Sequence, residues 1–365
     1  MKKIADCLTV AAFFIIIVMF AARTLLFGKT AAANETENMN IRQKTETYVD
    51  GNFPLSANWK SLRTTMLVMT GKNEFDNVYI LQKRLVDTSC DYDKEKFLES
   101  VEDINKFAAG TSAQIYVMLV PTAAGIYSSQ LPAYAQDIDQ RELIDRIYYA
   151  LNKDISTIDT FYPLYSARSN YIYYRTDKKW TSFGAYYAYA EGIKQMGFEP
   201  VALSNYDQEY ASDSFYGNLY SKLCYSRIPA DRVNIFRSKY QSTVESVELY
   251  SGEQMLTAKS VYFRSALKTS DKSNIFLQGD NFTKATVKTT LEDGPKLLLV
   301  KGSYANTFVP FLTPHYSEIT LVDPGKLEEE GKTLSDTVNP DDYDQVLFLY
   351  DCDEFLETNN FDLLK

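Results

Sequence analysis

A chain of 365 residues, of which 45% are apolar and 14% aromatic, is long enough to bury a sizeable core, so its composition excludes a disordered protein. The formal net charge is −10 and no cluster of Lys and Arg is larger than a pair, which argues against a nucleic-acid partner because phosphate binding requires a basic surface. One histidine and four widely separated cysteines leave no recognisable zinc or iron–sulfur site, and no loop has the carboxylate spacing of a Ca²⁺ site. We therefore expect neither a metal ion nor another cofactor.

Residues 1–30 have the features of an export signal. Lys2 and Lys3 precede an uncharged apolar run, residues 7–22, whose length is near the lower limit for a membrane span and above that of a usual signal-peptide core. Alanines at 31–33 offer a cleavage site, so a cleaved signal and an uncleaved anchor are both open at this point. The polar stretch 31–47 is interpreted as a spacer, which precedes a domain formed by residues 48–365.

Strands and helices are expected to alternate through most of this domain. Apolar residues at helical spacing predict an amphipathic helix over 94–109, and the continuous apolar run 115–120 predicts a buried parallel strand. This alternation favours an α/β fold with a mainly parallel sheet. Between about 200 and 290 the periodicity weakens, which we interpret as an elaborated insert. Further elements are a helix over 139–151 and strands over 78–81, 155–161, 244–250, 296–300, 319–323 and 346–350.

The densest local pattern is the stretch 171–189, which places charged residues between an aromatic segment predicted as a strand edge, 171–174, and an aromatic helix. Thr181 and Ser182 are good N-caps for this helix, and Gly197 is a plausible stop. Residues 177–180 are therefore expected in a strand-to-helix loop, where α/β proteins usually bind ligands. The residue types by themselves also fit a solvated turn whose tryptophan, Trp180, fills the core.

Two motifs of this sequence resemble those of a known family. Residues 175–181, Arg-Thr-Asp-Lys-Lys-Trp-Thr, with Gly-Ala-Tyr-Tyr at 184–187, are similar to the signature of the DHHW family, which has Asp-His-His-Trp at this place. Residues 301–312 with 315–319 are similar to the family's Lys-Asp-Ser-Tyr-Ala block, and the similarity covers about residues 48–355. The family in turn resembles SGNH-hydrolase-like proteins of the alginate O-acetyltransferase type. The resemblance implies an SGNH-hydrolase-like sandwich, outside the cytoplasm, on an uncleaved membrane helix within residues 1–30.

Ser303 is the candidate nucleophile. An apolar strand, a Lys-Gly-Ser turn and a predicted helix would place its hydroxyl at the carboxyl edge of the sheet, near backbone N–H groups. By resemblance Ser303 stands at the family's nucleophile position, and Asp177 and Lys179 stand where relatives carry Asp and the general-base His. The one imidazole, His315, lies about 15 Å further on if the intervening residues are helical. We interpret His315 as a turn or surface histidine, so a Ser-His-Asp triad is absent.

Lys179 is a poor replacement for the histidine. A lysine acts as a base only when its pKa is lowered by several units, and Asp177, two residues away, is expected to keep Lys179 charged. Three further positions, at which the family motifs usually carry other polar residues, also differ in this sequence. They are Gly302, Asp280 and Gly325. We therefore expect a catalytically degenerate site. The alternative is an active serine esterase or O-acetyltransferase that uses Ser303 with Lys179.

The resemblance implies that relatives take part in the O-acetylation of cell-surface polysaccharide together with a membrane-bound O-acyltransferase. The resemblance therefore implies a membrane-anchored, non-catalytic member that binds glycan or serves as a scaffold, with the acyltransferase and the glycan as partners in the cell envelope. A purely structural envelope interaction protein is a third possibility. Two lysines in place of imidazoles predict a preference for anionic glycans. The candidate glycan-binding residues are Arg175, Lys178, Lys179, Trp180 and Tyr304.

Overall fold

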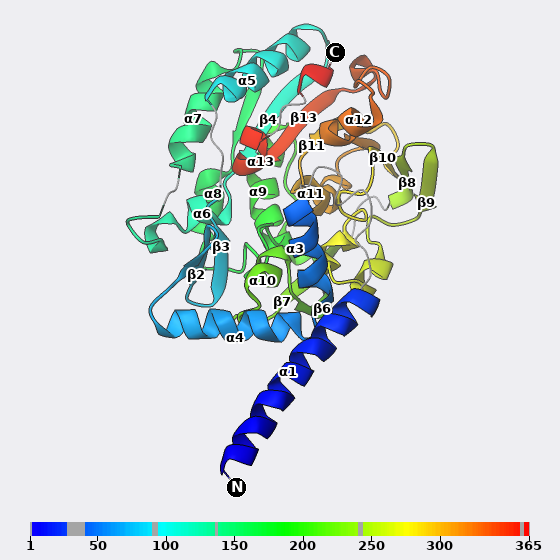
Figure 1. Ribbon diagram of the computed structural model, residues 1–365. Helices are drawn as coiled ribbons and strands as arrows, with labels where there is room; N and C mark the ends of the chain where they lie inside the picture. Colours follow the sequence, from blue (N-terminus) through cyan, green and yellow to red (C-terminus); the bar gives the residue numbers. More distant parts are fainter. Residues whose placement is uncertain are drawn as a thin grey trace. The chain divides into compact units, whose positions relative to one another are not determined.

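The computed structural model describes residues 2–27, 41–89, 94–135, 138–239, 244–357 and 361–364. The chain divides into two compact units. Figure 1 shows the helices and strands coloured along the sequence. The smaller unit comprises residues 1–72 and 221–226, and the larger unit comprises residues 73–220 and 227–365.

The smaller unit contains the helices α1 (Lys2–Phe27), α3 (Ile41–Asn52) and α4 (Ser56–Met69). The Tyr48 hydroxyl donates to the Thr24 carbonyl at 2.9 Å, which joins α3 to α1. Among the described residues, no helix reaches the length and apolarity that crossing a membrane requires, so the predicted membrane helix is not confirmed. The predicted spacer lies outside the described residues up to residue 40, and from Ile41 onward it belongs to α3.

The larger unit is built on an eight-stranded sheet with the order β5-β4-β13-β11-β12-β10-β8-β9. The first five strands of this order are parallel, and the last three are antiparallel to their neighbours. The strands are β4 (Gln114–Val120), β5 (Ser156–Asp159), β8 (Val244–Ser251), β9 (Gln254–Ala258), β10 (Lys284–Thr289), β11 (Lys296–Lys301), β12 (Glu318–Val322) and β13 (Gln345–Asp351).

Helices cover both faces of the sheet, because its central strands are apolar on both sides. Along β4 the odd residues from Ile115 to Leu119 pack into one core, and the even residues from Tyr116 to Val120 pack into another. The first core is covered by α5 (Lys94–Ala109), α7 (Gln140–Ala150), α12 (Pro324–Glu330) and α13 (Cys352–Glu357). The second core is covered by α6 (Ala123–Ile126), α8 (Phe161–Ser166), α9 (Ser182–Gln195) and α11 (Ala305–Leu312).

Smaller elements complete the chain. A three-stranded antiparallel sheet and a separate two-stranded ribbon accompany the main sheet, and α10 (Asn218–Leu223) runs from the larger unit into the smaller one. The three strands are β1 (Glu74–Phe75), β2 (Val78–Leu81) and β3 (Arg84–Asp87), and the ribbon pairs β6 (Tyr206–Phe215) with β7 (Asp231–Ser238).

The predicted α/β alternation is confirmed, and the predicted helix over 94–109 has the bounds of α5. Two expectations need correction. The sheet is mixed, because β10, β8 and β9 from the region around 244–289 extend the parallel part with antiparallel strands. Residues 171–174 do not form a strand, and only a single bridge joins Tyr173 to Trp180.

Candidate functional site

The loop that carries Asp177 is held in shape by its own carboxylate. Asp177 is buried and accepts the backbone N–H groups of Lys179 and Asn218, each at 3.0 Å. Gly217 is required for this arrangement, since a Cβ there would lie 2.2 Å from the Asp177 carboxylate. Asp177 therefore binds the backbone amide of Lys179, and no ion pair between its carboxylate and the Lys179 ammonium occurs in the part of the chain that the structure describes.

A second buried carboxylate, Asp231 at the start of β7, supports the same loop from the other side. It accepts the backbone N–H groups of Arg175 and Thr176 at 2.8 Å and the hydroxyl of Tyr171 at 2.5 Å. Burial raises the pKa of Asp231, although its hydrogen-bond donors oppose the shift. Sequence reasoning missed this residue, because a lone Asp in an irregular region carries no local signal.

The two family-like motifs lie against each other. Trp180 donates its indole N–H to the Tyr304 carbonyl at 3.0 Å, and the Tyr304 hydroxyl donates to the Lys178 carbonyl at 2.7 Å. The rings of Trp180 and Tyr304 are 5.0 Å apart, and both residues are at most 1% exposed. These two rings therefore cannot stack on a sugar in this structure. The helix that follows is α9, which Thr181 caps through its hydroxyl.

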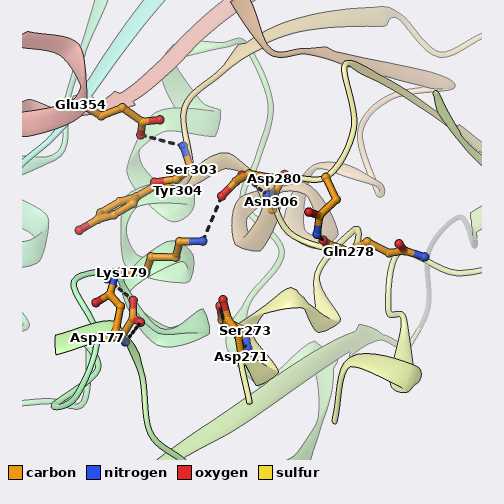
Figure 2. A network of polar contacts seen from close by, with 12 residues as sticks. Asp177, Lys179, Asp271, Ser273, Gln278, Asp280, Ser303, Tyr304, Asn306 and Glu354 are labelled. Atoms are coloured by element: carbon orange, nitrogen blue, oxygen red, sulfur yellow. Dashed lines mark hydrogen bonds and ion pairs between the residues drawn. The ribbon is translucent and has the colours of Figure 1, made fainter. Parts of the chain in front are cut away.

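A chain of ion pairs connects the motifs at the carboxyl edge of the sheet (Figure 2). The Lys179 ammonium lies 3.1 Å from Asp280, whose other carboxylate oxygen lies 2.8 Å from the ammonium of Lys301. Lys301 ends β11, is fully buried, and also contacts Asp323 at the end of the adjacent strand β12 at 3.1 Å. Asn306 donates to Asp280 at 2.9 Å. Asp280 is thus the central anion of the site.

The charged groups of this ion-pair network keep one another ionised. Burial opposes the charge on each group, but the attraction between opposite charges outweighs it. The pKa of Asp280 is therefore well below its usual range, and the pKa values of Lys179 and Lys301 are raised. Lys179 was expected to remain protonated because of Asp177, but the carboxylate that contributes most is Asp280.

Ser303 follows directly after β11, as its motif predicts, and it is half-buried. Its backbone N–H donates to the Glu354 carboxylate at 2.8 Å (Figure 2). A Cβ on the preceding residue, Gly302, would lie 2.6 Å from the same carboxylate. The absence of a side chain at Gly302 therefore leaves room for Glu354, which comes from α13.

Glu354 belongs to a pair of interacting carboxylates. Asp351 is buried at the end of β13 and accepts the backbone N–H groups of Asp353 and Glu354, each at 3.0 Å. Burial and the nearby Asp351 raise the pKa of Glu354. Lys178 is exposed by surface area, but the protein around it still removes part of its hydration, which lowers its pKa. The negative charges of Asp351 and Glu354 outweigh this effect and raise the pKa of Lys178.

His315 lies in a turn, which is one of the two positions expected from the sequence, but it is not at the surface. It lies in the turn after α11 but is only 8% exposed, and its ring is 5.2 Å from that of Phe198. The Tyr189 hydroxyl accepts the Val201 N–H at 2.8 Å and shares a hydrogen bond with His315 Nε2 at 2.7 Å. Burial lowers the pKa of His315 to about 4.

Because His315 is the only histidine of the chain, its titration can be followed directly by NMR. We expect the imidazole signal to titrate near pH 4. The pKa of His315 in the folded protein lies below its unfolded value of about 6.5, so the contribution of the neutral ring to stability is fully present above about pH 6.5. As the pH falls toward 4, the free energy of unfolding should decrease by about 2–3 kcal/mol. In His315→Gln this part of the pH dependence of the unfolding free energy should disappear. A pKa near 6.5 in the folded protein would contradict the buried position.

No group of three or more His, Cys, Asp or Glu side chains among the described residues has a geometry that could hold a metal ion. The acidic side chains at the carboxyl edge instead accept N–H groups or pair with lysines. The arrangement is thus an ion-paired site with a serine at its border.

Comparisons with known proteins agree with this architecture. A crystal structure of a DHHW family protein from Eubacterium siraeum has a TM-score of 0.63 at 21% identity, with 80% of this chain and 95% of that chain covered. PatB1 from Bacillus cereus has a TM-score of 0.66 at 17% identity, with 79% and 99% covered, and its structure with a sulfonyl adduct has a TM-score of 0.65 at 16% identity, with 79% and 98% covered. These likenesses show a shared fold. A comparison with curated protein sequences finds no significant match. The sequence model of the DHHW family, described as DHHW protein, matches residues 60–322, and the chain therefore belongs to the DHHW family.

Proposed function

We propose that this DHHW protein is a catalytically silent member, which binds or scaffolds polysaccharide in an envelope O-acetylation system. One observation carries the proposal: the ammonium of Lys179, which stands at the position of the family's general base, is paired with Asp280 at 3.1 Å. The family's resemblance to proteins of the alginate O-acetyltransferase type supports the polysaccharide as the ligand and a membrane-bound O-acyltransferase as the partner. Anchoring in the cell membrane through residues 1–30 is part of the same proposal.

Ser303 needs a base before it can attack an ester. A serine–lysine enzyme requires a neutral lysine near physiological pH, and the carboxylate of Asp280 instead raises the pKa of Lys179. The one imidazole is engaged with Tyr189 in the core on the far side of α11. Glu354 is the remaining candidate, and its hydrogen bond is to the backbone N–H of Ser303.

That hydrogen bond also opposes catalysis at the next step. Acyl transfer proceeds through a tetrahedral oxyanion, which backbone N–H groups near the nucleophile stabilise, and the loss of one such donor typically costs about 10²–10³ in rate. In this chain the Ser303 N–H is occupied by a carboxylate. When Glu354 is ionised it places negative charge beside the position where the oxyanion would form. The site therefore lacks both the base and an available oxyanion donor at Ser303.

The charge of the site favours a neutral glycan. Lys179 and Lys301 are paired with Asp280 and Asp323, and Lys178 lies in the field of Asp351 and Glu354. Among the described residues of the site, carboxylates match these lysines, so the preference for anionic glycans that the two lysines suggested is not part of the proposal. Lys178 and the half-buried Arg175 and Ser303 remain as accessible candidate contacts.

Both parts of the proposal can be tested on one preparation of the full-length chain. We expect no release of p-nitrophenol from its acetate ester above that of Ser303→Ala at any pH from about 6 to 10, the range in which a serine–lysine base would ionise. In titrations, a neutral envelope oligosaccharide should bind at least as well as a uronic-acid oligosaccharide of equal length. Activity that disappears in both Ser303→Ala and Lys179→Met would establish the enzyme alternative. Absence of binding to every glycan would leave the structural envelope protein as the better description.

A further inference from the structure

Helix α4 in the smaller unit presents its large apolar side chains to the outside. These side chains recur at alternating intervals of four and three residues, which places them on one face of the helix as a continuous stripe. We call this set the α4 stripe. Its members and their exposed fractions are Trp59 (51%), Leu62 (46%), Met66 (58%) and Met69 (78%), with Leu55 (63%) directly before the helix.

The opposite face of α4 is the more polar one. The one fully buried residue of the helix is Thr64, whose hydroxyl donates to the Leu223 carbonyl at 2.8 Å. Ser56 and Ser61 are half-buried on this side, together with Leu67 and Val68. A surface helix of a globular protein usually turns its apolar stripe inward, whereas α4 turns its largest apolar residues outward. Exposed apolar patches of this kind mark a surface that binds another protein or a membrane.

The charge around the α4 stripe favours a membrane over another protein. Between Asp50 and Glu74 the sequence contains no acidic residue, but it contains Lys60, Arg63 and Lys72. This is the reverse of the chain as a whole, whose net charge is −10. Lys60 is half-buried near Cys224 on the side away from the stripe, whereas Arg63 and Lys72 are exposed. An apolar helix face with a tryptophan and exposed cations nearby fits the surface of a bilayer that contains anionic lipids.

Helix α1 of the same unit also carries exposed apolar side chains. The ring of Phe53, three residues before α4, packs edge-to-face on Phe20 of α1 at 5.6 Å. On α1 the large apolar side chains from Val10 to Met19 are 46–63% exposed. Two helices of one unit, α1 and α4, therefore both carry outward apolar side chains.

We propose that α4 lies along the surface of a lipid bilayer, with the α4 stripe among the upper acyl chains and with Arg63 near anionic headgroups. Trp59 is at the centre of the stripe, and tryptophan is favoured at the boundary between lipid and water. A second copy of this chain fits less well. The four-and-three spacing also occurs in coiled coils, but α4 has only 14 residues, and coiled coils usually sustain the pattern over three or four heptads.

The two tryptophans of the chain allow a direct test. Trp180 is fully buried in the larger unit, so lipid-borne quenchers report on Trp59. The full-length protein is reconstituted with phosphatidylcholine vesicles that do or do not contain phosphatidylglycerol, with part of the lipid brominated in the upper acyl chain. We expect tryptophan fluorescence to be quenched by the brominated lipid, more strongly when phosphatidylglycerol is present. This quenching should be lost in Trp59→Phe and weakened in Arg63→Gln.

A matched control places a tryptophan elsewhere on the surface. Tyr149 on α7 is 93% exposed, and Tyr149→Trp in the Trp59→Phe background should show no quenching by the same vesicles. Absence of quenching at Trp59, whether or not the protein is recovered with the vesicles, would overturn the proposal. Equal quenching at position 149 would also overturn it. Concentration-dependent self-association that protects Trp59 from quenching would identify a second copy as the occupant instead.

Discussion

Replacing Lys301 by methionine is expected to lower the free energy of unfolding by about 2–4 kcal/mol. The ammonium of Lys301 is fully buried and lies within 3.1 Å of two carboxylates, Asp280 and Asp323. Methionine is similar in length, but it leaves these two carboxylates without their shared cation. The expected loss is set below that of a fully buried pair because Asp280 remains 35% exposed and water screens it in part. Urea unfolding at neutral pH gives the measurement.

The matched control is Lys326→Met. Lys326 pairs with Glu329 at 2.8 Å, but both side chains reach the solvent, so we expect a loss of at most about 0.5 kcal/mol. A second variant separates the charge from the packing. Adding Asp280→Asn to Lys301→Met should recover part of the loss, since one uncompensated carboxylate is removed. Equal effects of Lys301→Met and Lys326→Met would show that the buried network does not stabilise the fold.

The parallel part of the sheet could be predicted from the sequence because its strands are buried on both faces. A run such as 297–300, four consecutive apolar residues before a turn, has few other interpretations, and β11 occupies this place. The antiparallel extension could not be predicted. Strand β8 has an alternating pattern typical of a half-exposed strand, but its position beside β10 depends on pairing with residues far along the chain.

The place of Ser303 after an apolar strand could also be predicted, whereas the partners of the charges in the two family-like motifs could not. Sequence proximity suggested that the Asp177 carboxylate would pair with the Lys179 ammonium. The carboxylate instead accepts the backbone N–H of Lys179. The true partner, Asp280, is 101 residues away. Glu354 reaches Ser303 only because β13 lies beside β11 in the sheet, and no pattern along the chain encodes that adjacency. The burial of Trp180 and Tyr304 likewise depends on their mutual contact.

Replacing Trp180 by alanine is expected to cost about 3–5 kcal/mol of unfolding free energy, the largest effect of a single substitution at this site. The indole is completely buried, is stacked 6.0 Å from Phe308, and is 5.0 Å from the ring of Tyr304. Alanine would leave a large cavity and would remove the hydrogen bond to the Tyr304 carbonyl. Because this bond joins the loop of Asp177 to the turn of Ser303, hydrogen exchange in both segments should accelerate. Urea unfolding and amide exchange of the same sample give the two measurements.

Trp59→Ala is the matched control in the same chain. Trp59 is 51% exposed, so in the absence of lipid its replacement should change the stability by no more than about 0.5 kcal/mol. Trp180→Phe should fall between the two, because the ring retains most of the packing but loses the N–H donor. The comparison also decides how the tryptophan of the Asp-Lys-Lys-Trp motif acts. A loss below about 1 kcal/mol for Trp180→Ala would be inconsistent with a buried indole, and it would make the ring available to stack on a sugar.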